Sequence, residues 1–191
     1  MAQEVYARLT LDNPELAEPI LYRMKPILNS RRYLDIGHYH HLQSIFLLKT
    51  GDIDHALKHG KEALRFARET GTPFPEGLNC ITVAQMYFEK GEEQTARKLN
   101  TRAESIGHSM QSRYLEMLSL FNKAYFNLKS GKRDQARHPL TAALKIRKGI
   151  DLKNFSCWRR GFMQDLYEEA LRSGIEVEYV RRLIRTRNLR P

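Results

Sequence analysis

The sequence predicts an all-α fold built from three helical hairpins that are copies of one another. Three glycines, Gly51, Gly91 and Gly131, follow each other at intervals of 40 residues, and alanines stand five and twelve residues after each of them. A fixed period of this length is typical of repeat proteins, in which each unit buries its apolar face against the next one. Chance is a poor explanation for three columns in one register.

Each of these glycines is expected at the turn between two helices, because a residue without a Cβ atom takes the left-handed conformation that ends a helix. The two alanines lie two helical turns apart, on one face of the second helix, where small side chains let the helices approach closely. After Gly51 the apolar residues recur at helical intervals and stop at Gly71. We expect Gly107 and Gly149 to end the second helices of the next two hairpins.

The two ends of the chain complete the predicted stack. Asn13 and Pro14 form a good helix start, and the helix that they open is expected to be the second half of a hairpin whose first half is missing. After Gly149, helices are expected over about 154–173 and 176–187. The whole chain is then a single α-solenoid, divided into a half repeat (14–29), three repeats (33–71, 75–107 and 110–149) and C-terminal capping helices with a basic tail (154–191).

A turn glycine followed by two alanines seven residues apart resembles the tetratricopeptide repeat, over about residues 16–149. The common repeat has 34 residues, and the longer period here is similar to the helical sensor segments of MalT-like, ATP-dependent bacterial transcriptional regulators. The end of the chain, Gly174 to Pro191, is similar to the stretch that closes such a segment ahead of a winged-helix or LuxR-type effector. The resemblance implies a right-handed superhelix of tetratricopeptide-like helix-turn-helix hairpins, with ATPase and DNA-binding domains elsewhere in the parent chain.

The resemblance also implies a concave groove, lined by the first helix of each hairpin. Its expected lining is His38, His41, Ile45, Lys49, Leu78, Ile81, Gln85, Glu89, Leu118, Phe121, Tyr125 and Lys129. An apolar and aromatic groove with a few charges suits a peptide, a partner helix or a small organic ligand better than a polyanion. Two plainer interpretations stay open: single apolar residues of this set pack against neighbouring helices, and the array is a scaffold without a small ligand.

The charge is uneven along the chain. The 32 basic and 22 acidic residues give a net charge of +10, and the part from Lys145 onward holds 12 of the basic and 6 of the acidic residues. Arg181, Arg182 and Arg185 are candidate anion contacts, but the segment lacks the interleaved aromatic residues of single-strand nucleic-acid binders. A basic last turn favoured by the helix dipole is the plainer interpretation, and direct nucleic-acid contact is not favoured.

Catalytic and metal-binding motifs are not found. Gly60-Lys61-Glu62 lacks the earlier glycine and the hydroxyl residue of a nucleotide-binding loop, and neither a nucleophile elbow nor a zinc-binding helix motif occurs. His55 and His59 are spaced to hold a metal from one helix face, but a third ligand is not visible. The cysteines, Cys80 and Cys157, are expected to be buried free thiols. We therefore expect no catalytic residues, metal or cofactor.

The sequence thus favours a non-catalytic sensor or interaction segment of a larger transcriptional regulator. A small-molecule or peptide signal, or another protein, would bind in the concave groove. The alternative is a basic helical adaptor that binds RNA or DNA through its arginine-rich end. No apolar run approaches the roughly 20 residues of a membrane span, and no secretory signal is visible, so we expect a cytoplasmic location without membrane contact.

Overall fold

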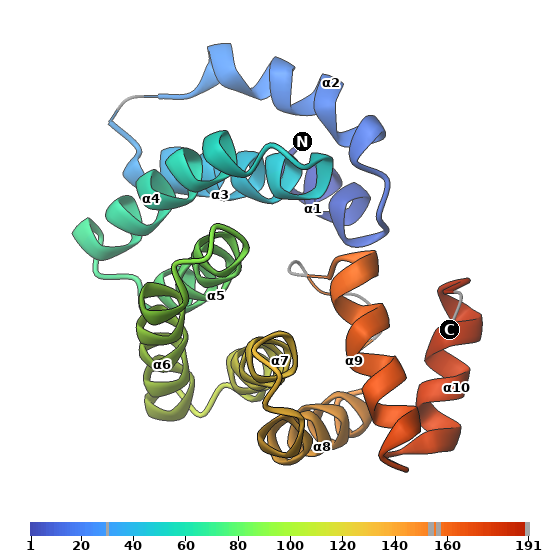
Figure 1. Ribbon diagram of the computed structural model, residues 1–191. Coiled ribbons are helices and arrows are strands. Elements are labelled where there is room, and N and C mark those ends of the chain that lie inside the picture. Colours follow the sequence, from blue (N-terminus) through green and yellow to red (C-terminus); the bar gives the residue numbers. More distant parts are fainter. Residues whose placement is uncertain (30, 153–154, 156–157, 190–191) are drawn as a thin grey trace.

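The computed structural model describes residues 1–29, 31–152, 155 and 158–189, and this part of the chain forms helices and turns without a β-strand (Figure 1). The helices are α1 (Ala2–Thr10), α2 (Pro14–Met24), the short 3₁₀ helix η1 (Lys25–Ile27), α3 (Tyr33–Thr50), α4 (Ile53–Glu69), α5 (Pro73–Glu89), α6 (Glu93–Ser109), α7 (Arg113–Lys129), α8 (Arg133–Gly149), α9 (Arg160–Arg172) and α10 (Val177–Thr186).

The predicted hairpins are α3 with α4, α5 with α6, and α7 with α8. Gly51, Gly91 and Gly131 lie in their turns with φ angles of 91°, 81° and 74°, which confirms the left-handed turn. A Cβ atom at any of the three would meet nothing within 4 Å, so backbone conformation rather than lack of space favours glycine there. The six alanines that follow the glycines at the predicted spacing are all exposed by 1% or less. The alanines that recur in the sequence are therefore residues that pack in the core.

Gly107 does not end a helix, contrary to expectation. It lies inside α6, which continues to Ser109, and a Cβ atom at this position would come within 3.1 Å of the Leu115 Cβ atom and 3.2 Å of the Glu116 nitrogen. The glycine therefore lets α6 pass close to the start of α7. The turn comes later, at Gln111, which has a φ angle of 52°.

The ends of the array differ from the expectation in two places. The helix after Pro14 does have a first partner, because α1 precedes it and buries Val5 and Leu9 against the neighbouring helices. Near the other end, α9 begins at Arg160, whereas Phe155, Trp158 and Arg159 are not helical; Asn154 lies outside the described residues. The last predicted helix is confirmed as α10.

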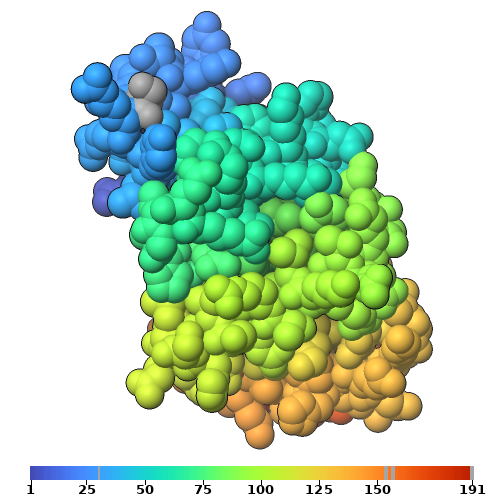
Figure 2. Space-filling model, turned by 90° about the vertical axis from the view of Figure 1, so that its left-hand side faces the viewer, coloured from blue at the N-terminus to red at the C-terminus, as the bar shows by residue number. Residues whose placement is uncertain are grey.

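The helix pairs follow one another around a curve. Helices α1, α3, α5, α7 and α9 contact one another in turn, and the side that they form is here called the inner face. In Figure 1, α5, α7 and α9 lie on the inside of the curve, and α6, α8 and α10 lie outside them. Seen from the α4 and α6 side, the chain forms consecutive bands from the N-terminal end downward (Figure 2). The curve is tight enough for the ends to meet: Arg160 of α9 lies 3.8 Å from the Asp12 carboxylate, between α1 and α2.

Candidate functional site

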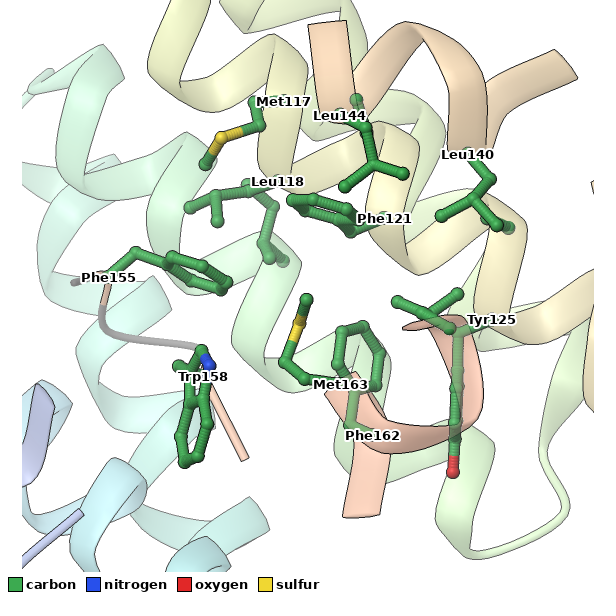
Figure 3. Close-up of a cluster of buried hydrophobic side chains, with 14 of the residues drawn as sticks. Met117, Leu118, Phe121, Tyr125, Leu140, Leu144, Phe155, Trp158, Phe162 and Met163 are labelled. Carbon is green, nitrogen blue, oxygen red and sulfur yellow. The ribbon is translucent and has the colours of Figure 1, made fainter. Parts of the chain in front are cut away.

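The part of the inner face formed by α7 is covered by the chain itself. Phe155 stacks on Phe121 with ring centroids 6.0 Å apart, and Phe162 lies 4.5 Å from Tyr125 (Figure 3). Trp158 is exposed by 1%, and Leu118 is equally buried. The apolar residues predicted to line the groove on α7 therefore pack against the segment that leads into α9.

The charged residues predicted along the groove are also engaged within the chain. Arg159 donates to the Glu89 carboxylate at 2.8 Å, and the Lys129 ammonium lies 2.6 Å from the Asp165 carboxylate. The Lys49 side chain is exposed by only 3% and donates to the Asp12 carboxylate at 3.0 Å and to the backbone carbonyl of Trp158. Lys49 thus connects the N-terminal turn to the segment ahead of α9.

Three further predicted residues lie between helices. Ile45, Ile81 and Gln85 are exposed by 2% or less. The Gln85 amide donates to the Asn122 side-chain oxygen at 2.8 Å, and the Asn122 amide donates to the Ile81 carbonyl at 3.0 Å. This buried polar link holds α5 to α7 and leaves these residues no surface for a ligand.

A pocket of about 430 Å³, here called the mouth pocket, remains where α3, α5 and α7 begin. Its walls come from α1, the first half of α3, the second half of α4, the first turns of α5 and the start of α7. Of the predicted groove residues, His38, His41 and Leu78 line it. The other lining residues are Tyr6, Tyr33, Leu34, Asp35, Gly37, Ala63, Phe66, Ala67, Thr70, Thr72, Phe74, Pro75, Asn79 and Tyr114.

The rim of the mouth pocket is apolar and exposed. Tyr33, Leu34 and Phe74 are exposed by 50%, 56% and 39%, although each carries a large apolar side chain. Their grouping around one cavity sets them apart from scattered exposed apolar residues, which are ordinary. Sequence reasoning missed them because they lie in the first turns of α3 and α5, outside the inward stripe.

Aromatic side chains form much of the pocket wall. Phe74 stacks on Tyr114 at 6.2 Å, and Tyr33 meets Phe66 edge to face at 5.5 Å between ring centroids. The hydroxyl groups of Tyr6 and Tyr114 lie 3.3 Å apart, so that α1 and α7 meet at the pocket. The wall is therefore held from both the N-terminal helix and the third repeat.

Two buried polar side chains, His41 and Asn79, line the pocket. The Nδ1 atom of His41 lies 2.7 Å from the Asn79 side-chain oxygen, and its Nε2 atom is buried without a hydrogen-bond partner among the described residues. Burial lowers the pKa of His41 to about 4. Burial likewise lowers the pKa of His38, against the opposing effect of Asp35. Both imidazoles are therefore neutral at pH 7.

The candidate anion contacts lie on the exposed side of α10. Arg181 pairs with Glu178 at 2.9 Å, Arg182 lies over the Tyr179 ring at 5.3 Å, and Arg185 is exposed. Arg187 belongs to the fold, because its guanidinium lies 4.9 Å from the centre of the Trp158 ring. An anion-binding role for the first three stays a prediction.

The two histidines with metal-ligand spacing have different partners. His55 lies 2.9 Å from the Asp52 carboxylate, and the Nδ1 atom of His59 lies 2.9 Å from that of His40. Across the described residues, His, Cys, Asp and Glu side chains do not gather in threes at any place suited to a metal ion.

Cys80 is buried, which raises the pKa of its thiol to about 11, and Cys157 lies outside the described residues. The described helices include none with the length and apolar character of a membrane span.

The sequence matches no known protein family and no curated protein. Solved structures do resemble the fold: two crystal structures of a kinesin light chain-like protein from Podospora anserina, with nearly identical TPR-like repeats, superpose with a TM-score of 0.58 each. They share 13% and 14% sequence identity with this chain, and the match covers 98% of it and 91% and 92% of theirs. The chain therefore has a TPR-like helical-repeat fold.

Proposed function

We propose that this chain is a non-catalytic binding module that takes up a small, mainly apolar organic ligand in the mouth pocket. The carrying observation is the contrast along the inner face: the α7 part is filled by Phe155, Trp158 and Phe162, whereas the α3 and α5 end keeps an apolar cavity. A volume of about 430 Å³ lies within the range of small-molecule sites. A long peptide laid along the whole inner face would have to displace this core.

The wall chemistry supports a ligand rather than a substrate. The polar side chains around the pocket are few and mostly paired with one another, as in Asp35 with Arg32 at 2.9 Å and Thr70 with Thr72 at 2.9 Å between hydroxyl oxygens. An acid, a base and a nucleophile within reach of one another would be needed for hydrolysis or group transfer. The described lining offers two neutral imidazoles beside aromatic side chains. This combination suits binding of a ligand better than catalysis.

Helical repeats of this kind commonly act by contact with other proteins, so the ligand is proposed to act as a signal. The resemblance of residues 174–191 to the closing stretch of MalT-like regulators extends the proposal: the chain would be the sensor of a cytoplasmic transcriptional regulator, beside an ATPase and a DNA-binding domain. Ligand uptake between α3, α5 and α7 would change how neighbouring hairpins pack. The coding sequence on either side tests this extension, and flanking domains of other classes would overturn it.

Binding to the pocket is tested with 2-methoxynaphthalene, an uncharged aromatic probe that fits the volume. Isothermal titration should detect binding to the wild-type chain, and Leu78→Trp, which fills the pocket from α5, should weaken it at least tenfold. Leu16→Ala removes an apolar side chain that is 48% exposed on α2, away from the pocket, and should leave the affinity unchanged. Equal binding by all three proteins, or no binding by the wild type, would contradict the proposed function.

A further inference from the structure

The inference rests on the proposed function and starts from the one buried polar atom of the mouth pocket that is left without a partner. His41 is exposed by 5%, and its side chain sits on α3 facing Asn79 of α5. Buried polar groups are paired in most proteins, and an exception calls for an explanation. Within the described part of the chain, the Nε2 atom of His41 is such an exception.

The hydrogen bond at the other ring nitrogen decides the chemistry of Nε2. The Asn79 side-chain oxygen can only accept, so the Nδ1 atom of His41 must carry the proton and donate. A neutral imidazole has one N–H group, and the Nε2 atom therefore presents a lone pair. Asn79 thus fixes the tautomer, and a side chain that lines the pocket carries an acceptor atom without a partner.

The charges around the pocket restrict the ligand further. In a chain with a net charge of +10, none of the described residues that line this pocket is lysine or arginine. An anionic ligand would have no counter-charge there. Asp35, the one carboxylate in the lining, already pairs with Arg32, so a cation would have to compete for it. The aromatic wall and the missing counter-charges favour an uncharged ligand.

We propose that the mouth pocket binds an uncharged aromatic or alicyclic molecule whose hydroxyl or N–H group donates a hydrogen bond to the Nε2 atom of His41. The apolar body of the ligand lies against Phe66, Phe74 and Tyr114. His41 is the specificity-determining residue, and Asn79 positions it. A ligand of the same shape without a donor leaves the acceptor unsatisfied, which is more costly than losing a surface hydrogen bond.

The test compares 2-naphthol with 2-methoxynaphthalene, which has the same ring system without the donor. Titration of the wild-type chain should give about 3- to 10-fold tighter binding of 2-naphthol, the range that one hydrogen bond supplies. Equal affinities would overturn the role of His41 while leaving the proposed function standing. Failure of both probes to bind would overturn the proposed function itself.

Two substitutions distinguish the acceptor role of the His41 Nε2 atom from the hydrogen bond that its Nδ1 atom makes to Asn79. His41→Asn keeps an amide donor where Nδ1 stood and removes the acceptor, so the preference for 2-naphthol should disappear. His41→Gln can place a carbonyl oxygen near the position of Nε2 and should restore part of the preference. Circular dichroism verifies that both variants fold, and the comparison of the two probes on the wild-type chain stands if either does not. A preference that survives His41→Asn unchanged contradicts the proposal.

Discussion

The two halves of the inner face use the same scaffold in opposite ways. At the start of α3 and α5, Tyr33, Leu34 and Phe74 remain exposed around a cavity, whereas beside α7 the ring of Phe121 is covered by Phe155. Both halves belong to hairpins whose helices have 17 or 18 residues and whose turns carry the same left-handed glycine. The difference therefore comes from Phe155 and Trp158 ahead of α9, which occupy one half of the concavity and leave the other open.

The largest effect is expected from removing the side chain that fills the closed half. Trp158→Ala should lower the free energy of unfolding by about 3–5 kcal/mol, because the indole is fully buried and its removal leaves a cavity. Urea denaturation followed by circular dichroism measures the change. Phe74→Ala, on the open half, should cost about 1 kcal/mol or less. Similar costs for the two substitutions would remove the distinction between the halves.

Lowering the pH should reduce the stability of the fold through His41, which lies in the open half. Its pKa is lowered by burial from 6.5 to about 4. Between pH 6.5 and pH 4, His41 is therefore protonated in the unfolded chain and neutral in the folded chain. The stability contributed by the neutral ring is complete above pH 6.5 and is lost as the pH falls toward 4. The loss amounts to about 3 kcal/mol, at 1.36 kcal/mol for each unit.

Thermal unfolding at pH 7 and at pH 4.5 measures this dependence. His41→Asn, which does not titrate in this range, should flatten the decline. His38, His40 and His59, whose pKa values are also lowered by burial, provide the background that remains in the variant. An unchanged slope would show that His41 is accessible to protons in the folded chain.

A smaller effect is expected at the junction of the two halves. Lys49→Met removes the buried ammonium that bonds the Asp12 carboxylate and the Trp158 carbonyl, and should cost about 1–3 kcal/mol because both acceptors lose their donor. Lys145→Met, at an exposed position on α8, is the matched control and should change stability by less than about 0.5 kcal/mol. Equal effects would indicate that the halves are held together elsewhere.

The smallest effect is expected in the turns that join successive hairpins, where the halves are alike. Gln111 and Asp151 adopt left-handed φ angles of 52° and 44°, at positions equivalent to Gly71. Gln111→Gly and Asp151→Gly should each raise the free energy of unfolding by about 0.5–1 kcal/mol, since relief of the left-handed conformation exceeds the added chain entropy. Differential scanning calorimetry can compare them, and opposite signs would show that the turns differ.

The sequence alone was sufficient for the repeat but not for the site. The glycine and alanine columns are local signals, and they predicted the helix pairs, the left-handed turns and the buried small residues. Helix α1 was missed because a helix of nine residues shows only the pair Val5 and Leu9 as a stripe, and its stability comes from packing on its neighbours.

The open and closed halves could not be predicted for a different reason. The groove was expected on the first helices, but the side chains that cover part of this face come from far along the chain, as in the contact of Lys49 with Trp158, 109 residues apart. No periodicity links such positions. The single tryptophan and the neighbouring Phe155 and Phe162, all within the helix expected over about 154–173, were the available hint that this stretch is part of the core.

The meeting of the two ends limits how the array can change. In an open solenoid each unit touches only its neighbours, so units can be gained or lost during evolution at small cost. Here the guanidinium of Arg187 lies 3.5 Å from the Thr10 carbonyl, and Arg160 reaches Asp12. Insertion of another 40-residue unit would separate these groups. The number of hairpins is thus fixed by closure, and the chain should melt in one cooperative step instead of fraying from its termini.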